Sequence, residues 1–381
     1  MSNFIAEYLK GQSGGNKGLP LGPGLEAVSK AINGLQKGMM IGVAASPKVG
    51  KSTFTDYAFV IQPYLSSLIT GAKVKWTYFS FEMDRITKEF DFASFFLYHD
   101  YGINLVILPE GITVNGQHSL QISSSYLRGR IQDDNEQIVK VDSKIFEFLQ
   151  VIYENRIVPM FGRYDEKGIK ISSGVIDFIE QKENPTGLRS KLLKKAEEDG
   201  SFIYQEFVDK EGQKGKKIIG YTPKDPTLLH CVVTDTIRKI PKERGYNMKE
   251  TIDKYLEYTT EIRNQCQFTF IHIIHLNRSM ADVQRMKMLG DMLYPTPEDI
   301  KDTGNLSEEC DHLFTLFDPN DDKFNLTTHF GVKIKDSHGN ELYPGMRTIH
   351  LVESRHVPFP QHFRVEMEGN IKNFNQLKIA S

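Results

Sequence analysis

The segment "VAASPKVGKSTF", residues 43–54, places a lysine and two hydroxyl groups directly after a run of small residues. It matches the phosphate-binding pattern G-x-x-x-x-G-K-[ST] except at the first position, where alanine replaces glycine. In that pattern backbone N–H groups cradle phosphates, the lysine reaches the β- and γ-phosphates, and the hydroxyl holds Mg²⁺. Alanine is tolerated at the first position if its φ is negative. The segment predicts a nucleotide site formed by Ala45, Ser46, Pro47, Lys48, Val49, Gly50, Lys51, Ser52 and Thr53.

Three further polar residues stand at the ends of apolar runs. Glu82 follows "YFSF", Asp235 follows "HCVVT" and His275 follows "FIHII". Because ligands bind at the carboxyl ends of parallel strands, these side chains are expected to surround one phosphate site. Asp235 would hold Mg²⁺ through water as the second metal anchor. Glu82 would act as general base on the attacking water, and His275 would contact the γ-phosphate.

Each of these residues also has a simpler interpretation. A lysine at a helix start can be solvated, and an aspartate at a strand end can merely begin a turn. A glutamate at a strand end is often solvated, and a histidine in an apolar run can be a buried residue with satisfied hydrogen bonds. The nucleotide site therefore depends on all of them meeting in one place.

The elements that must position these residues alternate between strands and helices. Apolar runs predict the strands, and segments with helical spacing predict the helices between them. The expected strands are 39–45, 73–83, 103–109, 228–235, 268–275, 313–317, 330–335 and 348–354, and the expected helices include 25–38, 51–69, 84–98 and 249–264. This alternation predicts an α/β fold with a mostly parallel sheet flanked by helices.

The domain organisation follows from two irregular regions. Residues 11–24 are rich in glycine, so residues 1–22 are expected to form a flexible lead and residues 23–381 one large domain. Residues 115–228 interrupt the alternation with helical segments and an expected β-hairpin at 202–221. Part of this region is interpreted as an α+β insertion on the outside of the core.

Composition excludes several classes of protein. The chain of 381 residues has a formal net charge of −2, so any surface that binds nucleic acid has to be local. Its three cysteines, Cys231, Cys266 and Cys310, have neither metal-ligand spacing nor a disulfide pattern, which is typical of a reducing compartment. We find no signal peptide and no run of 18 apolar residues, so we expect a cytoplasmic protein without a membrane span.

With these motifs in order, the chain resembles the RecA-like motor domain of the DnaB-family replicative helicases. The segments "GLQKGMMIGVAASPKVGKSTF", "YFSFEM", "VVTDT" and "HLNRSM" resemble that family's phosphate loop and its following strand ends. Family members open the loop with alanine or glycine and carry a proline two residues later, as Ala45 and Pro47 do here. His275 stands where many members have glutamine. The resemblance implies a RecA-like P-loop core that binds ATP and Mg²⁺.

The resemblance continues in the C-terminal part of the chain. "PEDIKDTGNLSEECDHLFTLF" and "VESRHVP" resemble later family segments, which makes Arg355 the candidate arginine finger for ATP in a neighbouring subunit. The family also implies a homo-oligomeric ring (a hexamer), single-stranded DNA as ligand, and a primase or loader as partner. Three features depart from the family: Glu353 replaces a lysine, the distance from Glu82 to Asp235 is longer, and the family's N-terminal helical domain is absent.

Two basic segments follow the strands that end in Asp235 and His275. In the family's fold these segments face the central channel, where cations could track a single-strand backbone without reading its sequence. A solvated charged surface is the alternative. The candidate DNA-binding residues are Arg238, Lys239, Lys242, Arg244, Arg278, Arg285 and Lys287.

Three functions remain open from the sequence. The first is an ATP-dependent helicase or translocase on single-stranded DNA, acting in DNA replication. The second is a filament protein of the RecA/RadA recombinase type. The third is a scaffold or loader that binds ATP without hydrolysing it.

Overall fold

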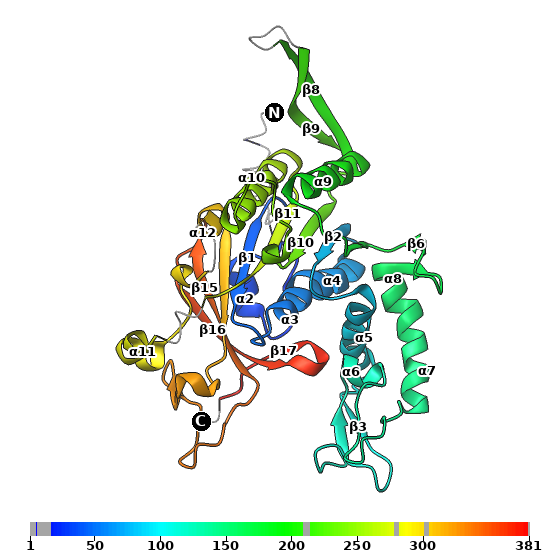
Figure 1. Ribbon diagram of the computed structural model, residues 1–381, viewed down its shortest axis with the longest axis vertical. Helices are drawn as coiled ribbons and strands as arrows, with labels where there is room; N and C mark the ends of the chain where they lie inside the picture. The colour runs from blue at the N-terminus through cyan, green and yellow to red at the C-terminus, as the bar shows by residue number, and fades with distance from the viewer. Residues whose placement is uncertain (1–4, 6–16, 209–213, 278–281, 301–304, 380–381) are drawn as a thin grey trace.

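The computed structural model describes residue 5 and residues 17–208, 214–277, 282–300 and 305–379. Its centre is a nine-stranded sheet in the order β17-β16-β15-β12-β1-β11-β10-β2-β7 (Figure 1). In sheet order the strands span Asn373–Gln376, Gln361–Glu368, Met346–Ser354, His312–Phe317, Met40–Ala45, Thr269–His275, Leu229–Asp235, Val74–Ser80 and Ile176–Ile179. The strands from β12 to β7 are parallel, whereas β15, β16 and β17 are antiparallel. The expected mostly parallel α/β sheet is confirmed.

Helices cover both faces of this sheet. One face packs against the segments from α2 to α8: α2 (Glu26–Ala31), α3 (Lys51–Asp56), η1 (Tyr57–Ile61), α4 (Gln62–Thr70), α5 (Arg85–Tyr101), α6 (Ser124–Leu127), α7 (Ser143–Ile152), η2 (Tyr153–Ile157) and α8 (Val158–Phe161). The other face packs against α9 (Pro185–Asp199), α10 (Met248–Cys266) and α12 (Asn305–Glu309). Because side chains alternate along a strand, Ile41 and Val43 of β1 enter the first core and Met40 and Ala44 enter the second.

Smaller elements surround the sheet. The separate two-stranded pairs are β3 (Leu105–Ile107) with β4 (Ser119–Gln121), β5 (Gly162–Tyr164) with β6 (Lys170–Ser173), and β13 (Thr328–His329) with β14 (Val332–Lys333). The helix α11 (Val283–Leu289) stands away from the body, and short 3-10 turns occupy Ile237–Lys239, Gly290–Met292, Pro297–Asp299, Asp322–Phe324 and Gly369–Ile371. The expected strand at 330–335 is therefore only the short β14, outside the main sheet. Its partner β13 lies directly before it in the chain, across a turn at Phe330 and Gly331.

The region 115–228 is only partly external. The strand β7 extends the main sheet beside β2, and Leu188, Leu192 and Ala196 of α9 are fully buried in the second core. The hairpin of β8 (Gly200–Val208) and β9 (Lys214–Pro223) projects away from the sheet, as expected of an insertion (Figure 1).

The end of the expected lead packs on the domain. Leu19 pairs with Leu35 through backbone hydrogen bonds, and Leu21 is fully buried. The division of the chain at residue 22 stays a prediction.

Two sequence-based exclusions can be compared with the structure. Cys231, Cys266 and Cys310 are buried free thiols, and burial raises the pKa of each. Within the described ranges, no helix is both long and apolar enough to cross a membrane.

The first core makes a testable prediction about stability. Phe314 on β12 is fully buried between Phe54 and Phe59, with ring centroids 5.9 and 6.5 Å away. We expect Phe314→Ala to lower the free energy of unfolding by about 3–5 kcal/mol, because it leaves a cavity that the sheet cannot close. Urea unfolding measures this. Ile69→Ala, at a residue that is 88% exposed, serves as control and should change stability by less than about 0.5 kcal/mol. Equal effects of the two substitutions would contradict this assignment of the core.

Candidate functional site

The phosphate loop connects the end of β1 to the start of α3. Ala45 is the last residue of β1, pairs with His275 and Leu316 on the neighbouring strands, and is not among the residues with positive φ. Positive φ values occur later in the loop, at Lys48 (67°) and Gly50 (109°). Alanine therefore fits the position at which the usual pattern has glycine.

Lys51 begins α3 and turns into the protein rather than into solvent. Only 8% of it is exposed, and its Nζ donates a hydrogen bond to the Ser46 carbonyl oxygen at 3.3 Å. Burial lowers the pKa of the Lys51 ammonium, while the carboxylates of Asp235 and Glu82 oppose this change. An anion bound in the loop would supply a stronger partner for this buried cation.

Strand register brings the other candidate residues to the same edge of the sheet. His275 is the partner of Ala45, and Asp235 is the partner of Ser80, two residues before Glu82. The Ser52 hydroxyl bonds to the Asp235 carboxylate, and the imidazole Nε2 of His275 lies 3.5 Å from Oε1 of Glu82. The structure thus brings together Lys51, Ser52, Glu82, Asp235 and His275.

The electrostatics of this cluster bear on its chemistry. Burial raises the pKa of the Asp235 carboxyl, and the Lys88 ammonium and the Ser52 hydrogen bond act against this. Burial and the Lys51 charge lower the pKa of His275, so its imidazole is neutral at pH 7. The hydroxyl of Ser52 and the carboxylate of Asp235 are oxygen ligands of the kind that Mg²⁺ prefers, and their contact fits a site for that ion.

A buried lysine behind Asp235 was missed by the sequence analysis. Lys88 of α5 has no exposed surface, and its Nζ lies 2.9 Å from Asp56 Oδ2, 3.1 Å from the Tyr78 hydroxyl and 3.9 Å from Asp235 Oδ2. Burial disfavours the ammonium, but the carboxylates of Asp56 and Asp235 outweigh it and raise the pKa of Lys88. One signal was available, since Lys88 precedes the buried residues Phe92 and Phe95 by four and seven positions on the same helix.

The C-terminal segment joins the same network. Lys372, just before β17, lies 3.1 Å from Asp91 Oδ2 and 3.7 Å from Asp56 Oδ2. The helix that follows the phosphate loop is therefore tied to α5 and to the end of the chain through Asp56.

Arg355 lies at the opposite edge of the sheet. It follows β15 at the point where Ser354 pairs with His312, the first residue of β12, whereas the phosphate loop follows the last residue of β1. Its guanidinium donates to the Glu308 carbonyl oxygen and lies 3.9 Å from Asp311 Oδ1. Within one chain the structure does not bring Arg355 to the loop.

The candidate DNA-binding residues separate into different environments. Arg238 lies near the site, where its charge lowers the pKa of His275. Arg285 instead bonds to the buried carboxylate of Asp299 and to the Tyr294 carbonyl oxygen at 2.9 Å, which indicates a structural contribution. Arg278 lies outside the described residues. The exposed cations of the set are Lys239, Lys242, Arg244 and Lys287.

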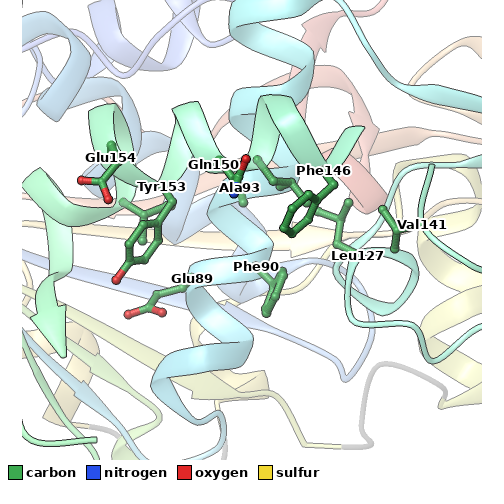
Figure 2. A pocket seen from close by; sticks show the side chains of 11 residues that line it. Glu89, Phe90, Ala93, Leu127, Val141, Phe146, Gln150, Tyr153 and Glu154 are labelled. Atoms are coloured by element: carbon green, nitrogen blue, oxygen red, sulfur yellow. The ribbon is translucent and has the colours of Figure 1, made fainter. Parts of the chain in front are cut away.

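A separate cavity of about 690 Å³ lies between α5 and α7 and contains none of these residues. Figure 2 shows Glu89, Tyr153 and Glu154 at one end of it and Phe146, Leu127 and Val141 at the other. The described part of the chain does not show what covers it.

Comparison with known proteins supports the fold. No protein-family model and no curated protein matches the chain. Among solved structures, a helicase ATPase domain superposes with a TM-score of 0.59 at 12% sequence identity, covering 98% of this chain and 97% of that one. A DnaB-like replicative helicase, whose structure was described with its interactions with primase, superposes with a TM-score of 0.60 at 12% identity, covering 99% and 68%. The chain therefore has the RecA-like α/β fold of these helicase ATPase domains.

The buried Lys88 gives a prediction for stability. Replacing it in Lys88→Met leaves the buried carboxylates of Asp56 and Asp235 without their main cation, so we expect a loss of about 3–5 kcal/mol in the free energy of unfolding. Because the pKa of Lys88 is raised, its contribution is complete at neutral pH and is lost only as the pH rises through the folded-state value. Urea unfolding at pH 7 measures it.

Two further variants test the cause of this loss. The double variant Lys88→Met/Asp56→Asn should regain part of it, because one uncompensated buried charge is removed. Lys249→Met, at an exposed position of α10, should be neutral within about 0.5 kcal/mol. A double variant less stable than Lys88→Met would argue against charge compensation.

Proposed function

We propose that the protein is an ATP-hydrolysing motor that moves along single-stranded DNA, as a helicase or translocase in DNA replication. The convergence of Lys51, Ser52, Glu82, Asp235 and His275 at one sheet edge carries this proposal. The RecA-like fold shared with two helicase ATPase domains supports it.

The proposed chemistry assigns one task to each residue. Backbone N–H groups of the loop and the Lys51 ammonium bind the β- and γ-phosphates. Ser52 and Asp235 hold Mg²⁺, which neutralises phosphate charge when bound. Glu82, one third of whose side chain is exposed, accepts a proton from the attacking water. Neutral His275 stands beside it and contacts the γ-phosphate.

The position of Arg355 supports an active site shared between copies of the chain. Its own phosphate loop is at the other edge of the sheet, so it can serve only a neighbouring copy. A head-to-tail arrangement of this kind closes into a ring, for which we propose a hexamer. An arginine supplied in this way contributes about 10³–10⁵ in rate. An isolated copy would hydrolyse ATP slowly.

Single-stranded DNA would bind through charge rather than base recognition. Arg238 next to the site, and the exposed Lys239, Lys242, Arg244 and Lys287, are the described candidates for phosphate contacts. The similarity to a helicase whose printed title names primase makes a primase, or a loader, a candidate partner.

The first functional prediction concerns ATP hydrolysis. We expect ATPase activity to rise with single-stranded DNA and with protein concentration, and Lys51→Ala to abolish it by removing the cation at the phosphates. Phosphate release, measured across both concentrations, tests site, assembly and ligand together. An equal rate with and without DNA would remove the motor function. Nucleotide binding without phosphate release would favour a scaffold or loader, and helical filaments in electron microscopy would favour a recombinase.

The second prediction concerns sharing of the active site. Arg355→Ala and Lys51→Ala should each be inactive alone, but an equal mixture should recover about a quarter of wild-type activity if random assembly pairs intact residues across the interface. The recovered rate is read from phosphate release. Mixing Arg355→Ala with the double variant Lys51→Ala/Arg355→Ala is the control and should recover nothing. No recovery in the first mixture would show that Arg355 does not act between copies.

A further inference from the structure

An arginine from the antiparallel part of the sheet reaches the underside of the phosphate loop. Arg347, the second residue of β15, donates a hydrogen bond from Nε to the carbonyl oxygen of Val49 at 3.2 Å. Val49 is itself buried and directly precedes Gly50. Arg347 lies outside every motif that identifies the site.

The guanidinium of Arg347 is held from two other directions. Its Nη2 lies 2.9 Å from Oδ2 of Asp318, and its Nη1 donates to the Met346 carbonyl oxygen at 2.7 Å. Only 12% of the side chain is exposed. Asp318 directly follows β12, and its other oxygen accepts a hydrogen bond from the backbone N–H of Asn320 at 3.0 Å. The Val49 carbonyl therefore meets a donor whose direction is already set.

Fixing this carbonyl also fixes a donor of the loop. In a planar trans peptide the C=O of one residue and the N–H of the next point in opposite directions. When Arg347 holds the Val49 oxygen, the N–H of Gly50 points away from Arg347. On a further side, Met367 fills the space beside Gly50, since a Cβ there would come within 2.4 Å of its Sδ. The peptide between Val49 and Gly50 has little freedom to turn.

We propose that Arg347 is a positioning residue for the phosphate loop, which holds the Val49–Gly50 peptide so that its N–H faces a bound polyphosphate. This inference rests on the proposed nucleotide site. Arg347 does not touch the ligand in this proposal, and Asp318 neutralises its charge, so it acts through direction rather than attraction. Donors arranged in advance bind an anion without reorganisation, which is the advantage of such a contact.

The experiment compares three variants with wild type. Arg347→Met keeps the aliphatic stem but removes every donor, and Arg347→Lys keeps the charge for Asp318 without the planar set of donors. Arg364→Met is the matched control, because Arg364 on β16 also donates to a carbonyl, that of Phe330 at 2.9 Å, away from the loop. The readouts are the Kd values of ATP and of inorganic triphosphate by calorimetry with Mg²⁺, and the Tm of each protein.

We expect Arg347→Met to weaken binding of ATP and of inorganic triphosphate by the same factor, about tenfold, as for loss of one hydrogen bond from a charged group. Arg347→Lys should lose at least about threefold. It decides the question if Arg347→Met does not fold. Arg364→Met should leave both Kd values unchanged.

Unchanged affinity for triphosphate in both Arg347 variants, or an equal loss in Arg364→Met, would overturn the positioning role while leaving the nucleotide site intact. If wild type binds neither ATP nor triphosphate, the proposed function fails, and this inference fails with it.

Discussion

The arrangement of the site depends on one buried cation. Lys88 has no exposed surface, so its ammonium requires carboxylates close to it, and it finds Asp56 and Asp235. Asp56 belongs to the helix that follows the phosphate loop, and Asp235 ends β10. Through Lys88, the two halves of the candidate nucleotide site are fixed to α5. Each of these elements keeps its charge buried only while the others remain in place.

The strand β15 connects the two edges of the sheet. Arg347 near its start contacts the phosphate loop of its own chain, and Arg355 just beyond its end contacts Asp311 at the far edge. The residue proposed to complete a neighbour's site and the residue proposed to position the loop thus stand on one rigid element. A strand with partners on both sides transmits little bending, because its hydrogen bonds to β12 and β16 restrain it. Loop geometry and the exposed arginine therefore depend on the same part of the fold.

The sequence alone determined the alternation of strands and helices, the mostly parallel sheet and the residues at its carboxyl edge. Apolar strands buried on both faces are continuous runs, so "MIGVAA" and "HCVVTD" are recognisable by composition, and the loop motif places Lys51 and Ser52 directly after the first of them. The helix from Lys51 to Thr70 was recognised in the same way.

Only the tertiary structure decided which distant residues support that site. β7 is four residues long and β16 alternates polar side chains, so neither has a strong local pattern. Lys88, Lys372 and Arg347 have no motif, because a lysine or arginine is identical in sequence whether it is solvated or buried against a carboxylate. Their partners, Asp56, Asp91 and Asp318, come from other elements. Such contacts arise from packing between segments far apart in the chain, which local spacing does not encode.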